Sequence, residues 1–365
     1  MTTSNHYDKI NLSISEVQCE RTRCDNIMKK IISLITVIVL LMSTSCTKPT
    51  FTKDYWVMDT YCTVTLYEGV SKETTKIVSD ILNDCEERLL IKDDSKSFFA
   101  ETDNCSIPIQ NDIYEMLELC LKVSDLSDGK FDITIAPLSV LWDIQNRKMP
   151  PEKTDIYEAK KLVDHNNIIL TENSLTLLKE DTGIDIGAVG KGYAGDRTAE
   201  LLKEKGFNSG LLNLGGNITV FGENPNRDDG YFIIGIKDPV NTSSVYASLK
   251  IQNTNMVTAG GYERYFEFED QIYHHIIDPE TGYPANSGIK SSTIVCENGI
   301  IADALATAIY VTGAEKGIEM LTVLKNEYPN IAAVLYTDDG NIITFNIANY
   351  EFTTYNFNGE ISYYE

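Results

Sequence analysis

Apolar residues recur every three or four positions in several segments of the chain, which is the spacing of an amphipathic helix. We expect helices at residues 72–90, 112–126, 155–163, 193–205, 300–311 and 314–325, and a further helix that starts at Pro137 and carries Trp142. The segment 193–205 is followed by Gly206, and glycine commonly follows the last turn of a helix. These segments account for the predicted helical part of the chain.

Other segments alternate apolar and polar positions between turn residues, as half-buried strands do. They are residues 55–67, 168–170, 175–178, 211–214, 218–221, 231–236, 245–251, 272–277, 331–336 and 342–347. Residues 131–138 are expected to form a strand that runs into the helix at Pro137. The strands cluster without a regular βαβ alternation, which favours the α+β class. We therefore predict a single domain with a mostly antiparallel β-sheet flanked by helices.

The stretch 183–195 combines an apolar lead-in, which carries Asp185, with five glycines where a turn must meet a helix. A strand, a glycine-rich turn and a helix start present free backbone N–H groups to an anion such as a pyrophosphate. Asp185 would then end the strand and face whatever the loop holds. The alternative is a glycine-rich connection that only requires positive φ angles.

Two standard phosphate-binding motifs fail in this stretch. Gly190, Gly192 and Gly195 have the spacing of the dinucleotide fingerprint, but the next strand, at residues 210–217, has no acidic residue to hold a ribose. A Walker A loop needs Ser or Thr after its lysine, whereas Lys191 is followed by Gly192. The chain also has no G-x-S-x-G motif, which disfavours a serine hydrolase.

Charge and cysteine spacing exclude several other classes. The 365 residues carry a formal net charge of −23, which argues against nucleic-acid binding. None of the eight cysteines form a C-x-x-C pair, and the five that follow the N-terminal region are expected to be buried thiols rather than a disulfide framework or a zinc site. With only four histidines, a zinc centre built on histidine is disfavoured.

The N-terminal region has the three parts of a secretory signal: Lys29-Lys30, the apolar run 31–42 and the small residues before Cys46. Cys46 after small residues resembles a bacterial lipobox, and we expect a lipidated Cys46 as the mature N-terminus. A plain signal or an anchor helix are the alternatives. Met28 is a more natural start than Met1. The predicted organisation is residues 1–46 as extension and lipoprotein signal, 47–54 as tether, 55–350 as the domain and 351–365 as a C-terminal tail.

Asp303 and Thr307 are four residues apart on a predicted apolar helix, so they share one face. Two hard oxygen ligands suit a Mg²⁺ ion that keeps waters and binds phosphate. Alternatively, Asp303 caps the helix start and Thr307 hydrogen-bonds backward. His274 and His275 are adjacent on a predicted strand, so one is expected to face the core and the other a site.

Taken in order, the motifs of this chain resemble those of the ApbE family of FAD:protein FMN transferases. The motifs are Met58-Asp59-Thr60, residues 131–138, 185–194, 213–217, 257–266 and 275–284, and Ala302 to Thr307. The resemblance covers residues 55–350 and implies a T-fold-like domain. It also implies binding of FAD with Mg²⁺, cleavage of the FAD pyrophosphate, release of AMP and attachment of FMN to a threonine of an acceptor flavoprotein.

The resemblance also assigns roles to residues. Asp185 matches the catalytic and FAD-contacting position, and Asp185 or His275 would accept the proton of the threonine hydroxyl. The other expected contacts with FAD are Met58, Ala136, Pro137, Leu138, Lys191, Ile276 and Ile277. The expected Mg²⁺ ligands are Asp303, Thr307 and the backbone carbonyl of Ala188.

Two other functions remain open at this stage. One is a Mg²⁺-dependent FAD pyrophosphatase, in which water replaces the threonine hydroxyl. The other is a non-catalytic FAD-binding lipoprotein. In each case we expect the protein to be lipid-anchored to the cell membrane on its extracytoplasmic face. We also expect the acceptor protein to be membrane-associated, and we expect no nucleic-acid partner.

Overall fold

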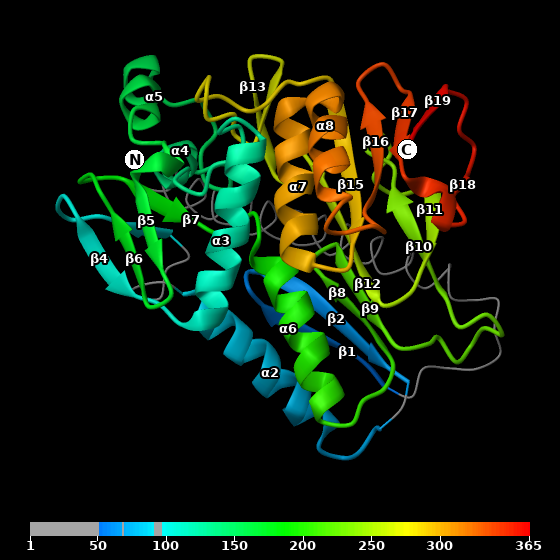
Figure 1. Ribbon diagram of the computed structural model, residues 1–365. Coiled ribbons are helices and arrows are strands. Elements are labelled where there is room, and N and C mark those ends of the chain that lie inside the picture. Colours follow the sequence, from blue (N-terminus) through cyan, green and yellow to red (C-terminus); the bar gives the residue numbers. More distant parts are fainter. Residues whose placement is uncertain (1–50, 68, 91–96) are drawn as a thin grey trace, which may run out of the picture.

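The computed structural model describes residues 51–67, 69–90 and 97–365 (Figure 1). The signal segment and the predicted lipidation site Cys46 lie outside these residues. The helices within the described part are α2 (Thr74–Leu89), α3 (Asn111–Leu126), α4 (Ala136–Trp142), α5 (Lys153–Lys160), α6 (Gly190–Glu204), α7 (Gly299–Thr312) and α8 (Ala314–Leu324). No helix in these ranges is long and apolar enough to cross a membrane.

The largest sheet in the described part has nine strands in the order β1-β2-β8-β9-β12-β15-β16-β17-β19. Its strands are β1 (Phe51–Val57), β2 (Thr60–Leu66), β8 (Gly210–Leu214), β9 (Asn217–Phe221), β12 (Thr254–Gly260), β15 (Ile289–Cys296), β16 (Ala332–Thr337), β17 (Ile342–Phe345) and β19 (Ile361–Tyr364). Neighbouring strands are antiparallel except for β17 and β19, which are parallel. This confirms the predicted α+β class.

The described part of the chain also contains four smaller sheets. They are β10 (Phe232–Lys237), β11 (Val245–Ile251) and β18 (Thr353–Thr354); β13 (Tyr265–Phe268) and β14 (Gln271–His274); β3 (Ser97–Phe99) and β7 (Gly183–Asp185); and β4 (Cys105–Pro108), β6 (Ser174–Leu177) and β5 (Ile168–Thr171). The segment that we expected to be a C-terminal tail therefore contributes β18 and β19.

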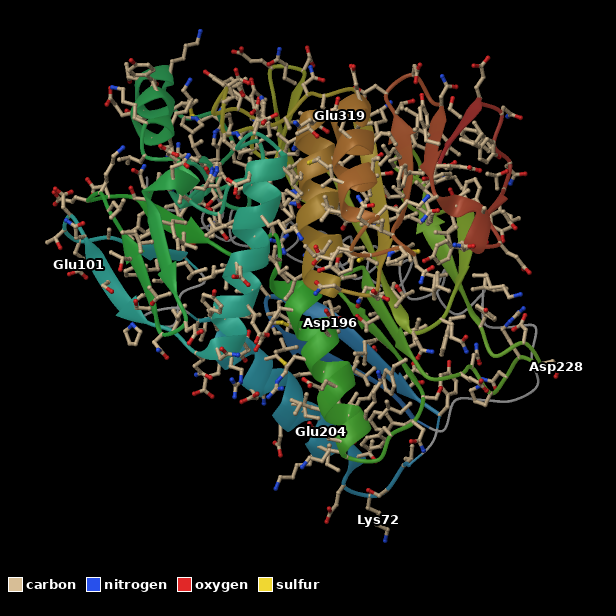
Figure 2. All side chains as sticks on the ribbon, in the orientation of Figure 1. Lys72, Glu101, Asp196, Glu204, Asp228 and Glu319 are labelled. Atoms are coloured by element: carbon tan, nitrogen blue, oxygen red, sulfur yellow. The ribbon has the colours of Figure 1, made fainter. Side chains whose placement is uncertain are left out.

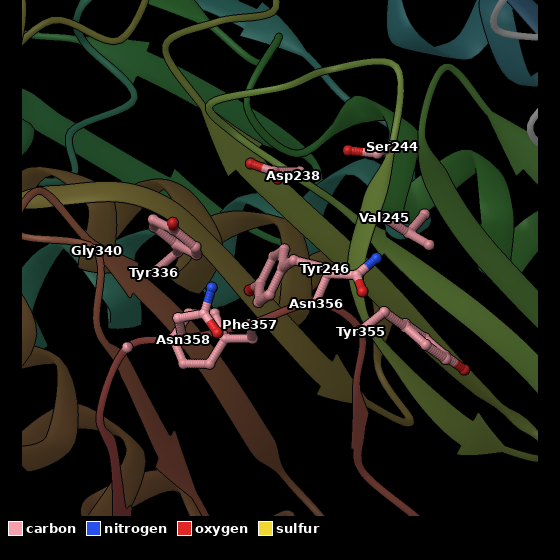
Figure 3. Close-up of a pocket in the computed structure, with 11 residues that line it drawn as sticks. Asp238, Ser244, Val245, Tyr246, Tyr336, Gly340, Tyr355, Asn356, Phe357 and Asn358 are labelled. Atoms are coloured by element: carbon pink, nitrogen blue, oxygen red, sulfur yellow. The ribbon is translucent and has the colours of Figure 1, made fainter.

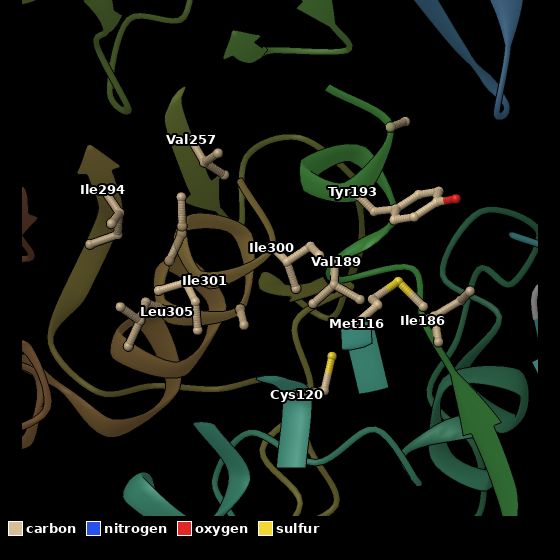
Figure 4. Close-up of a cluster of buried hydrophobic side chains, with 14 of the residues drawn as sticks. Met116, Cys120, Ile186, Val189, Tyr193, Val257, Ile294, Ile300, Ile301 and Leu305 are labelled. Carbon is tan, nitrogen blue, oxygen red and sulfur yellow. The ribbon is translucent and has the colours of Figure 1, made fainter. Parts of the chain in front are cut away.

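The large sheet is covered on both faces. Helices α6 and α7 pack against one face, and Figure 1 shows them with α8 in front of the strands. On β15, Ile294 belongs to the apolar core on the helical side, whereas Val295 belongs to a second core shared with β10 and β11. Figure 4 shows part of the first core, in which Met116 and Cys120 of α3 lie near Ile300, Ile301 and Leu305 of α7.

The structure confirms the predicted helices to within a few residues at each end, whereas two strand predictions are corrected and a central strand was missed. Residues 131–134 are not a strand, because Asp132 Oδ1 accepts hydrogen bonds from the backbone N–H and hydroxyl of Thr134 and holds a turn. The predicted strand 272–277 ends at His274. The central strand β15 was not predicted, because burial on both faces removes the alternation of apolar and polar positions.

Candidate active site

Asp185 is the last residue of β7, as predicted, and its carboxylate is held on both sides. Ser139 Oγ in α4 donates to Asp185 Oδ2 at 2.7 Å, and the backbone N–H of Gly187 donates to Oδ1 at 2.8 Å. The Asp185 backbone N–H donates to Ile133 O at 2.8 Å. The side chain is only partly buried. Asp185 is thus a fixed carboxylate that remains accessible at the strand end.

The start of α4 lies directly beside β7. Ile135 and Gly183 form a parallel β-bridge, and a Cβ atom at Gly183 would lie 3.0 Å from Ala136 Cβ. Ala136, Pro137 and Leu138 are buried. The structure therefore places the start of α4, which carries these three predicted FAD contacts, beside β7, with their side chains packed into the protein.

The glycines of the stretch 183–195 allow close packing. None of them has a positive φ angle, so the alternative that this stretch only requires positive φ angles is wrong. A Cβ atom at Gly192 would lie 2.1 Å from Gly299 O, and one at Gly195 would lie 2.3 Å from Thr219 Oγ1. Helix α6 can approach α7 and β9 only because these positions lack a side chain.

Asp303 lies in the second turn of α7 and faces the first turn of α6. It is only 4% exposed, and its Oδ2 accepts a hydrogen bond from the Gly192 backbone N–H at 2.9 Å. Lys191 Nζ lies 4.0 Å from Asp303 Oδ1. Burial raises the pKa of Asp303, and the positive charge of Lys191 opposes that shift. Among the described residues, the negative charge of this buried carboxylate is therefore only partly balanced, by the Lys191 ammonium group.

The alternative role of Asp303 as a helix cap is wrong. Asn298 is the N-cap of α7, and its side chain accepts a hydrogen bond from Ile301 N at 2.9 Å. Backward hydrogen bonding does occur on this helix at Thr312, which donates to Ala308 O at 2.9 Å. Among the described residues, no such bond is found for Thr307. Thr307 lies one helical turn beyond Asp303 and is partly exposed.

Asp303, Thr307 and the Ala188 carbonyl would be an oxygen ligand set of the kind that Mg²⁺ prefers. In the described part of the chain, no three His, Cys, Asp or Glu side chains gather to hold a metal, so the ion would also need waters or substrate oxygens. The Asn217 amide lies close enough to Asp303 to lower the pKa of that carboxyl. Its Nδ2 nevertheless makes no hydrogen bond of normal geometry, although it is buried. This weakly paired donor fits a site that a polar ligand completes.

Met58 lies in the turn between β1 and β2. Met58 and Asp59 both adopt left-handed backbone conformations, with φ angles of 56° and 55°. The Met58 N–H donates to Glu86 Oε1 of α2 at 2.7 Å, which anchors the turn. The turn after β8 packs against it, since a Cβ atom at Gly215 would lie 2.4 Å from Thr60 Oγ1. Two of the motifs that were separate in the sequence are therefore in contact.

The two adjacent histidines have different surroundings, as predicted. His274 is buried, and its Nε2 lies 3.1 Å from Ala285 O and 3.4 Å from the Tyr310 hydroxyl. His275 is partly exposed, and its Nδ1 lies 3.2 Å from Arg264 O. Desolvation by the surrounding protein, and after it the charge of Arg264, lower the pKa of His275, so its ring is neutral at pH 7.

The segment after His275 supplies the last predicted FAD contacts. Ile276 and Ile277 are both buried, at 6% exposure each. Ile276 O accepts from Ala285 N at 2.9 Å, and Ile277 forms an antiparallel bridge with Pro284. Their side chains thus form part of the protein core beneath the loop.

Sequence reasoning missed three residues that position this site. Ser139 orients Asp185, Glu86 anchors the Met58 turn, and Asn217 lies beside Asp303. Asn217 belongs to a motif that was recognised, so its position was available as a signal. Glu86 and Ser139 lie on ordinary amphipathic helices, where nothing in the local pattern distinguishes them.

The glycine-packed start of α6, the fixed Asp185 and the buried Asp303 form the candidate active site of this α+β domain. The sequence profile of the ApbE family matches residues 58–335, and the chain belongs to this family.

Similar proteins fit this assignment. The chain is 30% identical to an FAD:protein FMN transferase of Klebsiella pneumoniae (strain 342) over 241 residues, which covers 65% of this chain and 72% of the relative. It is 28% identical to that of Treponema pallidum (strain Nichols), covering 78% and 84% of the two chains. The crystal structure of the ApbE protein from Thermotoga maritima superposes with a TM-score of 0.68 at 26% identity, covering 80% of this chain and 96% of that one.

Proposed function

We propose that this protein is a Mg²⁺-dependent FAD:protein FMN transferase. It would cleave the FAD pyrophosphate, attach FMN to a threonine of an acceptor protein and release AMP. The observation that carries the proposal is the position of two carboxylates around one glycine-rich segment. Asp185 ends the strand before it, and Asp303 is hydrogen-bonded to Gly192 in the helix after it. Relatives named for this activity support the same conclusion.

The residues around α6 suit a pyrophosphate. Lys191 supplies a positive charge, and the start of α6 directs its helix dipole toward the same region. Asp303 and Thr307, with the Ala188 carbonyl, would hold the Mg²⁺ ion. When bound, that ion would neutralise phosphate charge and stabilise the leaving AMP.

Asp185 is our choice as the group that accepts the proton of the acceptor hydroxyl. Its carboxylate is oriented by Ser139 and by the Gly187 N–H, yet it stays partly exposed to an incoming substrate. His275 is the second choice, because its lowered pKa makes the free ring a weak base. A general base must lie within hydrogen-bond reach of the proton that it removes.

Asp185→Asn tests this function sharply. The asparagine keeps an oxygen for the Gly187 N–H, and its amide can donate to Ser139, so the local structure should persist. FMN transfer, measured as the mass gain of an acceptor incubated with FAD and Mg²⁺, should fall by about a hundredfold to ten-thousandfold. FAD affinity, measured by flavin fluorescence, should change much less. Asp181→Asn, an exposed aspartate before the same strand, is the matched control.

Each outcome has a clear meaning. Transfer near the normal rate in Asp185→Asn, with Asp181→Asn also normal, would reject Asp185 as the base and make His275 the next residue to test. AMP and free FMN without a modified acceptor would identify a pyrophosphatase. FAD binding without any AMP release would identify a non-catalytic flavin-binding protein.

We further propose that a lipid on Cys46 anchors the protein to the extracytoplasmic face of the cell membrane. The order of basic pair, apolar run and small residues before Cys46 supports this location. The acceptor would then be a membrane-associated flavoprotein with its target threonine on the same side.

A further inference from the structure

A cavity of about 320 Å³ has none of the candidate active-site residues in its lining, which Figure 3 draws. It is bordered by the loop after β10, the start of β11, the turn after β16 and the segment before β19. The lining residues are Asp238, Ser244, Val245, Tyr246, Tyr336, Gly340 and residues 355–359. Ligand pockets commonly measure about 300–1,000 Å³, so this cavity suits a small group rather than a dinucleotide.

The lining of this cavity carries a negative charge and no positive one. Asp238 is its one carboxylate, and the lining includes no lysine, arginine or histidine. Asp238 Oδ1 accepts hydrogen bonds from the backbone N–H groups of Val240 and Asn241, at 2.8 and 3.1 Å. Burial, and after it the charge of Asp238, raise the pKa of Tyr336. The charge of Asp238 therefore reaches the Tyr336 ring, which is one of the aromatic side chains that line the cavity.

That wall consists of aromatic rings in mutual contact. Tyr246 and Tyr336 have ring centroids 5.0 Å apart at an interplanar angle of 77°. Phe357 lies 6.4 Å from Tyr246 and 6.2 Å from Tyr336. Figure 3 shows these side chains grouped below Asp238, with Tyr355 beside them. Aromatic faces attract cations, and a neighbouring carboxylate strengthens the attraction.

One buried polar atom in the wall makes no hydrogen bond of normal geometry. Tyr246 is 3% exposed, and its hydroxyl makes no hydrogen bond of normal geometry. The Ser291 hydroxyl lies beside it as a weak hydrogen-bond partner that lowers the pKa of Tyr246, and it also lacks a hydrogen bond of normal geometry. A buried hydroxyl with only a weak partner is costly, so it can accept a further hydrogen bond from a ligand donor. An ammonium or guanidinium group can supply such a donor, whereas a quaternary ammonium cannot.

We propose that this cavity binds a primary ammonium or guanidinium group. The group would lie against the rings of Tyr246, Tyr336 and Phe357, pair with Asp238 and donate to the Tyr246 hydroxyl. Its source is either a small free amine or a basic side chain of a protein. The net charge of −23 favours approach of either cation. This site does not depend on the proposed transferase activity.

Isothermal titration with n-butylammonium tests the cation directly, and 1-butanol is the neutral comparison. We expect saturable binding of n-butylammonium and none of 1-butanol at the same concentrations. A blocked lysine tripeptide and its Nε-acetylated form then distinguish the two sources. Stronger binding of the tripeptide than of n-butylammonium would assign the site to a protein side chain, and the reverse would assign it to a free amine. Absence of saturable binding by both cations would overturn the proposal.

Two variants locate the binding. Asp238→Asn keeps the oxygen that caps Val240 and Asn241, and it should weaken cation binding on the order of tenfold to a hundredfold. Tyr246→Phe keeps the ring and removes only the weakly paired hydroxyl, so it should weaken binding by about two- to tenfold without lowering the melting temperature. Asp270→Asn, an exposed aspartate on another turn, changes the net charge equally and should bind normally. Wild-type affinity in Asp238→Asn, or an equal loss in Asp270→Asn, would overturn the assignment.

Discussion

Gly192→Ala should push α6 away from α7, and it therefore tests whether the contact between these helices requires a glycine at position 192. A Cβ atom at this position would lie 2.1 Å from Gly299 O and 2.6 Å from Gly299 C, and neither backbone atom can rotate away. Real Cβ contacts essentially never fall below 3.0 Å, so the helices must move apart by about 0.9 Å. The hydrogen bond from Gly192 N to Asp303 Oδ2, which measures 2.9 Å, would then be lost.

The magnitude follows from these contacts. Loss of a hydrogen bond to a charged group costs about 1.5–3 kcal/mol. Overpacking in a filled core adds about 1–3 kcal/mol. The better helix propensity of alanine returns about 1 kcal/mol. Gly192→Ala should therefore lower the free energy of unfolding by between about 1.5 and 5 kcal/mol.

Gly190→Ala is the matched control, because it makes the same change two residues earlier in α6. A Cβ atom there would lie 3.4 Å from Leu89 Cδ1, which is ordinary contact with a flexible side chain. Its free energy of unfolding should stay within about 1 kcal/mol of the wild type. Urea unfolding followed by far-UV circular dichroism measures both variants. Equal stability of Gly192→Ala and Gly190→Ala would refute the close-packing argument.

Three further predictions concern separate parts of the molecule. The hydrogen bond to Asp132, with Asp125 on the other ring nitrogen, raises the pKa of His165 above 6.5. The contribution of the protonated His165 to the free energy of unfolding is therefore fully present below about pH 6.5 and is lost as the pH rises through the raised pKa. His165→Gln should thus destabilise more at pH 5.5 than at pH 9 in urea unfolding, and an equal loss at both would refute this. Asp303→Asn should weaken Mg²⁺ binding, measured by calorimetry, by at least about a hundredfold, together with FAD cleavage; wild-type Mg²⁺ binding would exclude Asp303 as a ligand. Cys46→Ser should move the protein out of the membrane fraction, and unchanged fractionation would reject the lipid anchor.

Helices and isolated chemical groups were predictable because their signals are local. The period of apolar residues located α3 and α7 to within two residues, and Asp185 was placed correctly at a strand end. The turn at residues 131–134 was not predictable, because its alternating apolar pattern is also that of a strand. The hydrogen bonds of Asp132 to Thr134 and to His165 N outweigh that pattern.

The sequence by itself determined the class of fold, the helix positions and the residue types that the site can use. Only the tertiary structure decided which of them meet. It set Asp303 against Gly192, 111 positions apart in the chain, and joined Asp238, Tyr336 and Phe357 around one cavity. It also made β15 a central strand, with neighbours on both edges. Local periodicity follows from the geometry of a single helix or strand, whereas these contacts depend on how separate elements pack, which no short segment encodes.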